Sequence, residues 1–124
     1  MIDFQNGSLF KLAQCNPADV APLIEPILVD GEQTMVAAKA LRDYVVFTNK
    51  RLLAVNVQGM TGKKRDITSL PYSKIQSWSV ETAGTFDLDA ELEIWFSGLG
   101  KVRLEFRGRF DVTYLNRLIS SFVL

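Results

Sequence analysis

The run of three basic residues at Lys63, Lys64 and Arg65 could hold a phosphate, a lipid headgroup or an acidic protein. A cationic patch raises the local concentration of such anions. The run follows Gly62 and lies near an expected strand start. Because successive side chains of a strand point to opposite faces, only Lys63 and Arg65 would lie on the same face. A solvated strand start that discourages edge pairing explains the same residues, and we favour it.

Four carboxylates recur at every second position of one segment, and carboxylates are the ligands that hard cations prefer. They are Asp87, Asp89, Glu91 and Glu93. The apolar residues between them indicate a strand, whereas a calcium loop needs a central tight turn and a terminal bidentate acid. Arginines of the following strand offer these acids a simpler partner. We therefore expect no metal site and no cofactor.

The sequence lacks the residues that usually activate a catalytic nucleophile. None of the 124 residues is histidine, which excludes Ser-His-Asp and Cys-His mechanisms and histidine-containing zinc sites. Cys15 is the single cysteine, so no internal disulfide can form, and its apolar surroundings are typical of a buried thiol. No nucleophile elbow or phosphate-binding glycine loop is present. A hydrolase using carboxylates alone is the remaining enzymatic alternative, and we expect no enzyme.

The composition is that of an ordinary folded domain, with 48% hydrophobic and 23% charged residues. This length suits one domain. Fourteen basic and fourteen acidic residues give no net charge, which argues against nucleic acid as a partner and against simple attraction to an anionic membrane. No basic start with an apolar core follows Met1, and no uncharged run reaches the ~20 residues of a membrane helix. A cytoplasmic location is expected.

Short helices are expected in the first thirty residues. Asn16 directly before Pro17 is typical of a helix start, with a side-chain cap followed by proline in the first turn. Two further prolines inside this helix remove backbone hydrogen bonds and predict a kink or break. We expect residues 1–30 to form a helical segment that packs on a domain spanning residues 31–124.

Strands are expected from Thr34 to Arg107, because the hydrophobic period there changes to two. Asn49 and Lys50 separate two apolar runs and predict a tight hairpin, in which asparagine would tolerate a positive φ. Gly59 and Gly62 bracket the next turn. The expected strands are 34–41, 44–48, 52–57, 67–70, 74–82, 91–96 and 101–107.

The register of the last hairpin is restricted, because the apolar side chains of both strands must lie on the same face of the sheet. A two-residue loop would send one apolar face to solvent. A three-residue loop at 98–100 keeps both apolar faces together and predicts Ile94 opposite Leu104, with the last glycine in the left-handed conformation. On the outer face this register places Glu91 opposite Arg107.

An amphipathic helix closes the chain, with Asp111 as its expected cap. Its apolar stripe consists of Val112, Leu115, Leu118, Ile119 and Phe122. The order is short helices, about seven antiparallel strands and one helix. This order predicts a mainly β fold, a bent seven-stranded antiparallel barrel or split sandwich whose open end the C-terminal helix caps.

Two neighbouring strands are apolar on both faces, at residues 45–47 and 52–55. A small antiparallel sheet usually has one polar face, so either the N-terminal helices or another subunit has to cover the second face. The residues alone leave both alternatives open. The candidate subunit contacts are Val46, Leu53, Val55 and Trp95.

The segment VFTNKRLL at 46–53 resembles the strand-turn-strand signature of the bacterial pleckstrin homology domain family. The resemblance continues through QGMTGKK at 58–64 and LPYSKI at 70–75, is strongest at SVETAGTFDLDAEL at 79–92, and covers roughly residues 8–124. It implies a pleckstrin-like fold with additional N-terminal helices and a homo-oligomeric, ring-like assembly. It thereby favours a subunit interface on the doubly apolar strands.

Phosphoinositide binding, which the family name suggests, usually needs a basic loop between the first two strands. Here that connection is short, and Arg42 is offset by Asp43. We therefore expect a non-enzymatic module that self-associates into a homo-oligomer and acts in protein interaction or scaffolding, with an unidentified protein as a further partner. The alternative is peripheral binding to anionic lipid headgroups, or to another phosphate-bearing ligand, through Lys63, Lys64 and Arg65.

Overall fold

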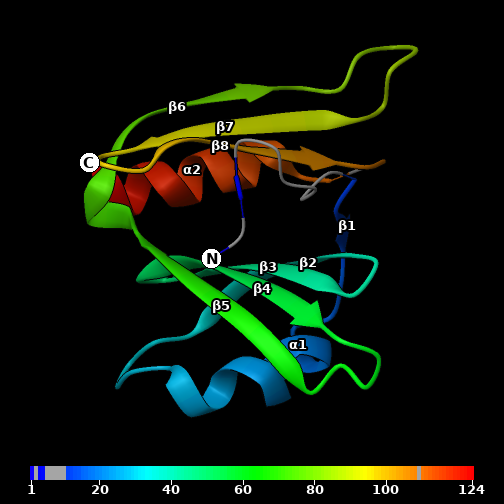
Figure 1. Ribbon diagram of the computed structural model, residues 1–124. Coiled ribbons are helices and arrows are strands. Elements are labelled where there is room, and N and C mark those ends of the chain that lie inside the picture. Colours follow the sequence, from blue (N-terminus) through cyan, green and yellow to red (C-terminus); the bar gives the residue numbers. More distant parts are fainter. Residues whose placement is uncertain (2, 5–10, 109) are drawn as a thin grey trace.

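Two antiparallel sheets pack face to face in the computed structural model, which describes residues 1, 3–4, 11–108 and 110–124 (Figure 1). The five-stranded sheet has the order β1 (Ala13–Gln14), β2 (Thr34–Ala40), β3 (Asp43–Thr48), β4 (Arg51–Gln58) and β5 (Lys64–Pro71). The three-stranded sheet has the order β6 (Ile75–Glu81), β7 (Ala90–Phe96) and β8 (Gly100–Phe106). The helices are α1 (Pro17–Ile24) and α2 (Val112–Val123), with short 3-10 turns η1 (Glu25–Ile27) and η2 (Tyr72–Lys74).

The predicted mainly β fold is confirmed, in its split-sandwich form. β5 and β6 belong to different sheets, with η2 between them, so the strands do not close into a barrel. The two-residue strand β1 was not expected from the sequence. The segment before it bridges the sheets, because Leu12 pairs with Phe106 of β8 just before the chain joins β2.

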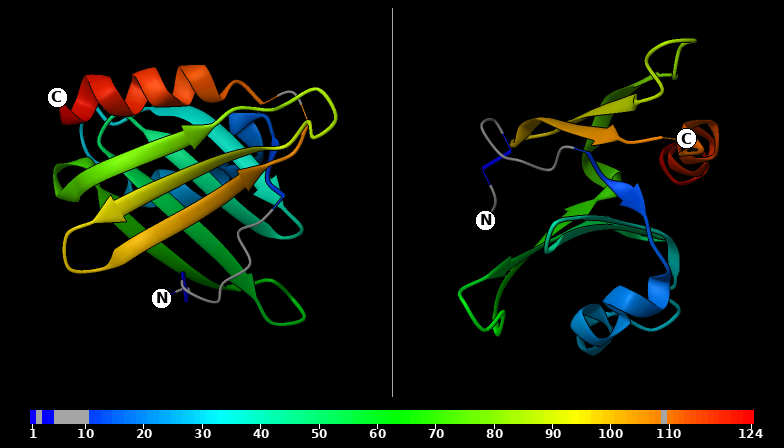
Figure 2. Two further views of the ribbon diagram at one scale, coloured as in Figure 1. Left: turned by 90° about the horizontal axis from the view of Figure 1, so that it is seen from above. Right: turned by 90° about the vertical axis from the view of Figure 1, so that its right-hand side faces the viewer.

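The main core lies between the two sheets, and α2 closes one open side of it (Figure 2). The capping prediction is confirmed, since Asp111 Oδ1 accepts a hydrogen bond from the Tyr114 backbone N–H at 3.0 Å. The apolar stripe of α2 faces this core. Its fully buried members include Leu115 and Ile119, which pack with the inner residues of β7 and β8.

A second, smaller core lies between the outer face of the five-stranded sheet and α1 (Figure 2). Asn16 caps this helix, with its Oδ1 accepting a hydrogen bond from the Ala18 backbone N–H. Val20 and Ile24 of α1 are buried against residues of β2, β3 and β4. Of the two alternatives for the second apolar face of β3 and β4, cover by the N-terminal helices or by another subunit, the structure shows cover by α1.

The β3–β4 hairpin has the predicted two-residue loop, since Phe47 pairs with Leu52. However, neither Asn49 nor Lys50 takes a positive φ. The side chain of Asn49 instead accepts a hydrogen bond from the Gln33 backbone N–H and donates one to the Gly31 carbonyl. Asparagine at this turn thus fastens the preceding loop to the hairpin.

The predicted register of the β7–β8 hairpin is wrong by two residues. Ile94 pairs with Val102, and Phe96 pairs with Gly100. A shift of two keeps every side chain on its face, so the hydrophobic pattern could not distinguish the two registers. Ser97 therefore lies in the loop, where its backbone N–H donates to the Lys74 carbonyl at 2.7 Å. Gly100 takes the positive φ that was expected of it.

Candidate interaction surfaces

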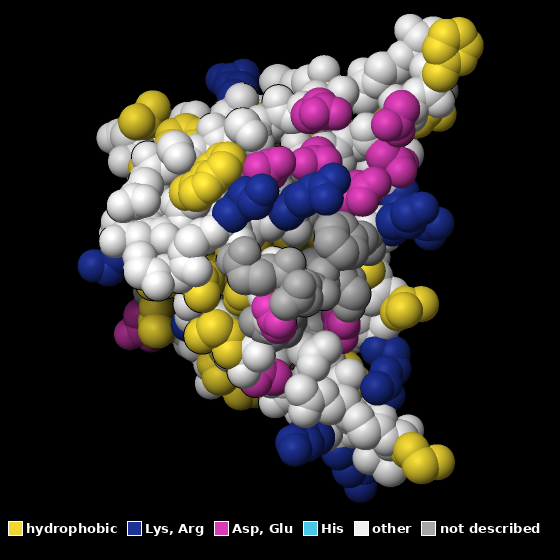
Figure 3. Space-filling model, turned by 45° about the horizontal axis from the view of Figure 1, so that its top comes forward, with side chains coloured by type: hydrophobic (Ala, Val, Ile, Leu, Met, Phe, Trp, Pro, Cys, Tyr) yellow, Lys and Arg dark blue, Asp and Glu magenta, His cyan; other side chains and the backbone are white. Residues whose placement is uncertain are grey.

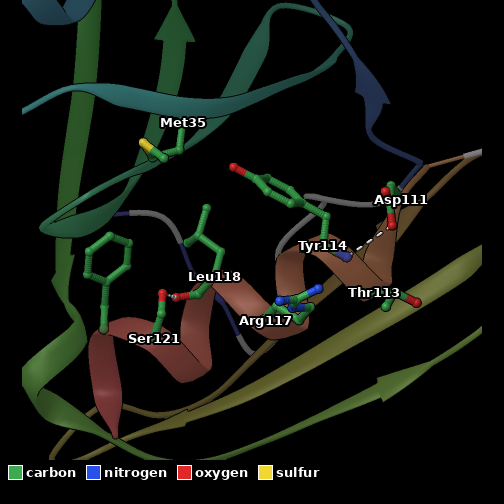
Figure 4. A pocket seen from close by; sticks show the side chains of 8 residues that line it. Met35, Asp111, Thr113, Tyr114, Arg117, Leu118 and Ser121 are labelled. Atoms are coloured by element: carbon green, nitrogen blue, oxygen red, sulfur yellow. Dashed lines mark hydrogen bonds between the residues drawn. The ribbon is translucent and has the colours of Figure 1, made fainter.

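A groove of about 520 Å³ lies between β2 and α2 (Figure 4). Its lining residues are Met35, Asp111, Thr113, Tyr114, Arg117, Leu118, Ser121 and Phe122. Met35 lies on the β2 side, whereas Tyr114 and Leu118 rise from α2 toward it. The groove is the space left where a helix meets the edge of a sheet, and it is open to solvent.

Apolar side chains on the walls of this groove are only partly covered. Met35, Tyr114 and Phe122 are 40%, 42% and 41% exposed, and buried Leu118 lies between them. Phe122 also stacks on Tyr72, with ring centroids 5.6 Å apart, which fixes one end of the groove. Half-exposed apolar groups that gather in a concave site are typical of a binding surface.

Two charged residues accompany these apolar walls. The Asp111 carboxylate is occupied as the helix cap. Arg117 makes no hydrogen bond or ion pair within residues 11–108 and 110–124, and its guanidinium is therefore available to an acidic ligand. The groove can accept an apolar side chain that is followed closely by a carboxylate.

The loop 28–33 is held against the β3–β4 hairpin by a buried ion pair between Glu32 and Arg51. Arg51 Nε lies 2.9 Å from Glu32 Oε2, and Thr48 Oγ1 donates to the same oxygen at 2.7 Å. Burial alone would raise the pKa of Glu32, but hydrogen bonds from Arg51, Thr48 and the Val29 backbone outweigh it and lower that pKa. The network has no unsatisfied buried side-chain atom within the described residues, which makes it a structural clamp.

Three exposed apolar side chains stand at loop tips on one end of the molecule. Leu41 joins β2 to β3, Met60 joins β4 to β5, and Phe86 joins β6 to β7. These loops share one end in the views of Figures 1 and 2, and Figure 3 shows apolar side chains at projecting corners of the molecule. Sequence reasoning missed all three, although a large apolar residue within a turn or beside glycine was a usable signal.

The predicted basic cluster lies at the β4–β5 tip. Lys63, Lys64 and Arg65 are all exposed, and Lys63 stays in the turn before β5 begins. Lys64 is opposite Gln58 and Arg65 is opposite Val57.

Arg42 from the neighbouring turn adds a fourth cation near this tip, because its Nη1 donates to the Gly59 carbonyl. Asp43, the acid expected to offset Arg42, instead accepts hydrogen bonds from Asn56 and the Val57 backbone. The basic cluster is therefore larger than the sequence indicated.

The four alternating acids do not converge. Glu91 lies 2.7 Å from Arg103, and Glu93 lies 3.5 Å from Lys101, both diagonal pairs across β7 and β8. The expected pairing of Glu91 with Arg107 is wrong, because the register differs by two residues. The hydrogen bond from Arg103 lowers the pKa of Glu91 despite partial burial.

The other two acids precede β7 in the chain. Asp89 Oδ1 accepts from the Gly108 backbone N–H, and Asp87 Oδ1 accepts from the Asp89 backbone N–H. In the described residues no group of three metal-ligating side chains is close enough to hold an ion.

The candidate subunit contacts divide into two groups. Val46, Leu53 and Val55 have no exposed area within the chain itself, because α1 covers them. A second subunit reaches them only if α1 leaves, so this packing gives no support to an interface there. Trp95 is half-buried on the outer face of β7, with Lys101 Nζ 5.9 Å from its ring centroid.

Cys15, expected to be buried, is partly exposed beside the second core. Burial raises the pKa of its thiol, and the nearby Asp19 carboxylate raises it further. A raised thiol pKa lowers the thiolate fraction and disfavours nucleophilic chemistry.

A family model for the bacterial PH domain matches residues 3–123. The chain belongs to the bacterial PH domain family. It is 48% identical over 95 residues to the uncharacterized protein YjqA of Bacillus subtilis (strain 168), an alignment that covers 77% of this chain and 76% of that protein.

Two solved structures have the same fold. One is a DUF1696 family protein with a pleckstrin-homology domain from Shewanella loihica PV-4, which has 43% identity, a TM-score of 0.78 and coverage of 92% of this chain and 98% of that chain. The other is a pleckstrin homology domain from Shewanella amazonensis SB2B, with 41% identity, a TM-score of 0.66 and coverage of 89% and 90%. Family membership thus accounts for the fold, while the surfaces have to indicate the function.

Neither α1 nor α2, nor any other helix among the described residues, has the length and apolar character to cross a membrane.

Proposed function

We propose that this chain is a non-catalytic binding module that self-associates into a homo-oligomer and acts in protein interaction within the cytoplasm. The groove between β2 and α2 carries the proposal, because three half-exposed apolar side chains surround it. The doubly apolar strands, which first suggested an interface, are already covered by α1. The groove replaces them as the surface that another molecule would cover.

The alternative occupants of such a groove differ in chemistry. A small metabolite would need several converging polar groups, whereas Arg117 is the cation that this groove offers. An apolar protein segment with a carboxylate matches both the walls and the charge. Protein is therefore the partner class that this surface favours.

Self-association is tested by sedimentation velocity of the purified full chain over a wide concentration range. We expect a species of several times the monomer mass whose fraction rises with concentration. A monomer at every concentration, including high micromolar protein, contradicts the oligomer. The same measurement on Tyr114→Glu, which changes an exposed groove residue, should show weaker association.

A second candidate function is binding to an anionic membrane surface or another phosphate-bearing ligand through Lys63, Lys64 and Arg65. One observation favours it: the exposed Met60 lies at the same hairpin tip, and Arg42 is fastened to that tip. An exposed apolar side chain next to basic residues suits peripheral contact with an anionic membrane, because apolar insertion and electrostatic attraction both contribute to binding.

Vesicle sedimentation distinguishes this candidate from the first. Each basic residue near an anionic surface contributes about 1 kcal/mol, so replacing Lys63, Lys64 and Arg65 with alanine should weaken binding by roughly 100-fold. The matched control replaces three other exposed bases, Lys50, Lys74 and Arg107. Equal vesicle binding by the two triple variants would remove the basic cluster from consideration.

A further inference from the structure

The loop 82–89 between β6 and β7 carries a preformed apolar projection. Phe86 at its tip is fully exposed, and Leu88 is more than half exposed. The backbone N–H of Gly84 donates to the Asp87 carbonyl at 2.6 Å, which folds the tip into a compact turn. The base of the loop is fastened because Asp89 accepts from the Gly108 backbone N–H. A projection held in shape before binding loses less entropy when it docks.

The charge of this loop is of one sign. Asp87 directly follows Phe86, Asp89 lies two residues further, and no basic residue occurs between Glu81 and Lys101. Asp87 accepts a hydrogen bond only from a backbone N–H among the contacts of the described residues, so no cation neutralises it there. The loop therefore presents an aromatic ring followed immediately by a carboxylate.

The groove between β2 and α2 has the complementary features. Its walls are the half-exposed Met35, Tyr114 and Phe122, and Arg117 is the cation beside them (Figure 4). Aromatic and methionine walls are suited to an inserted phenyl ring. A carboxylate one residue away from that ring would lie within reach of a guanidinium on the groove wall.

We propose that loop 82–89 of one copy docks into the β2–α2 groove of a second copy, with Phe86 between the apolar walls and Asp87 paired with Arg117. The proposal rests on the self-association proposed above and names its contact. Loop and groove are different surfaces of one chain, so the contact is head-to-tail and can repeat from copy to copy. Each copy offers one projection and one receptor.

Complementary variants test the head-to-tail contact directly. Phe86→Ser removes the projection and keeps the groove, whereas Tyr114→Glu with Arg117→Glu damages the groove and keeps the projection. We expect each variant alone to associate roughly tenfold to hundredfold more weakly, since burying a phenylalanine side chain contributes about that much. A one-to-one mixture of the two variants should form a heterodimer and no larger species. The intact projection of the groove variant can dock into the intact groove of Phe86→Ser, and no second complementary pair remains.

Met60→Ser is the matched control for Phe86→Ser, because it removes an equally exposed apolar side chain from another loop tip. It should leave the association constant unchanged. Charge reversal supplies an independent test: Asp87→Lys and Arg117→Glu should each weaken association, and the two changes in one chain should restore it. Thermal melting confirms that each variant is folded.

The results separate this contact from the broader proposal. If the unaltered chain associates and Phe86→Ser associates equally well, the docking contact is wrong while self-association stands. If the unaltered chain is monomeric throughout, both are wrong. Loss of vesicle binding in Phe86→Ser, with no change in mass, would instead identify the loop as a membrane contact and overturn the proposal.

Discussion

Glu32 shows how much a single buried carboxylate can stabilise in this fold. Its side chain has no exposed area and receives hydrogen bonds from Arg51, Thr48 and the Val29 backbone. These bonds fasten loop 28–33 to the β3–β4 hairpin. This pair could not be predicted from local pattern, because the two residues are separated by nineteen positions and lie in segments of ordinary polarity.

Removing this carboxylate should destabilise the domain. Glu32→Ala leaves the Arg51 guanidinium without its main partner in a largely dry position. We expect the free energy of unfolding to fall by about 3 kcal/mol. This is the lower end of the roughly 3–5 kcal/mol that breaking a buried ion pair costs, because Arg51 is partly exposed. Urea unfolding measures it. Glu25→Ala, an exposed acid in η1, is the control and should change stability little.

The lowered pKa of Glu32 also predicts how stability depends on pH. The carboxyl binds its proton more weakly in the folded chain than in the unfolded chain, whose pKa is near 4.5. Its contribution is therefore fully present above that pH and is lost as pH falls through the lower, folded value. Unfolding curves between pH 6 and pH 3, roughly the range in which carboxyls titrate, should show a smaller decline for Glu32→Gln than for the unaltered chain. Equal declines would contradict this role of Glu32.

Leu41 is strained by the turn that it occupies. It has a φ of 54° in the β2–β3 turn and is almost fully exposed, so its side chain gains little packing there. Left-handed backbone costs a branched residue roughly 1–2 kcal/mol, and asparagine tolerates it better. Leu41→Asn should raise the free energy of unfolding by about 0.5–1 kcal/mol. The control Met60→Asn changes an equally exposed loop tip whose backbone φ is negative, and it should leave the free energy of unfolding unchanged.

At the scale of elements, α1 decides what the five-stranded sheet can do. Its residues Val20 and Ile24 cover the outer apolar face of that sheet. Val20→Asp should release the helix, expose this face and increase binding of a hydrophobic dye. Ala18→Asp, an exposed position on the same helix, should leave dye binding unchanged. Dye binding that stays equal in both variants would mean that α1 is not needed as a cover.

Apart from β1, the strands and the helices α1 and α2 could be predicted from the sequence because their patterns are local. Periodicity of two, the cap at Asn16 and the cap at Asp111 each depend on neighbours within a turn or a strand. The β7–β8 register did not follow, since a shift of two residues keeps the same faces together. In the observed register the Ser97 backbone N–H lies in the loop and donates to the distant Lys74 carbonyl, a contact that no local pattern indicates.

The candidate site was harder to predict for the same reason. The β2–α2 groove brings Met35 together with residues 76 to 87 positions later in the chain, and no local pattern marks it. Lys63, Lys64 and Arg65 were visible as a run, whereas Arg42 joined them only through the turn at Gly59. Composition identified residues able to bind, and the fold determined which of them share a surface.

At the scale of the whole molecule, the basic tip and the β2–α2 groove respond differently to salt. The chain has no net charge, so long-range attraction is weak, and binding to anionic vesicles would depend on local cations at the β4–β5 tip. Docking of loop 82–89 would depend mainly on apolar contact with one ion pair. Raising ionic strength from about 0.05 M to about 0.5 M shortens electrostatic range to a few ångströms.

Vesicle binding should therefore fall more than roughly tenfold over this range, while self-association should change by less than about threefold. Sedimentation of the same preparation, with and without vesicles, measures both. If self-association instead falls as steeply as vesicle binding, charges rather than apolar walls hold the copies together. That result would move the interface from the groove to the charged surfaces, since an apolar contact is not weakened by screening.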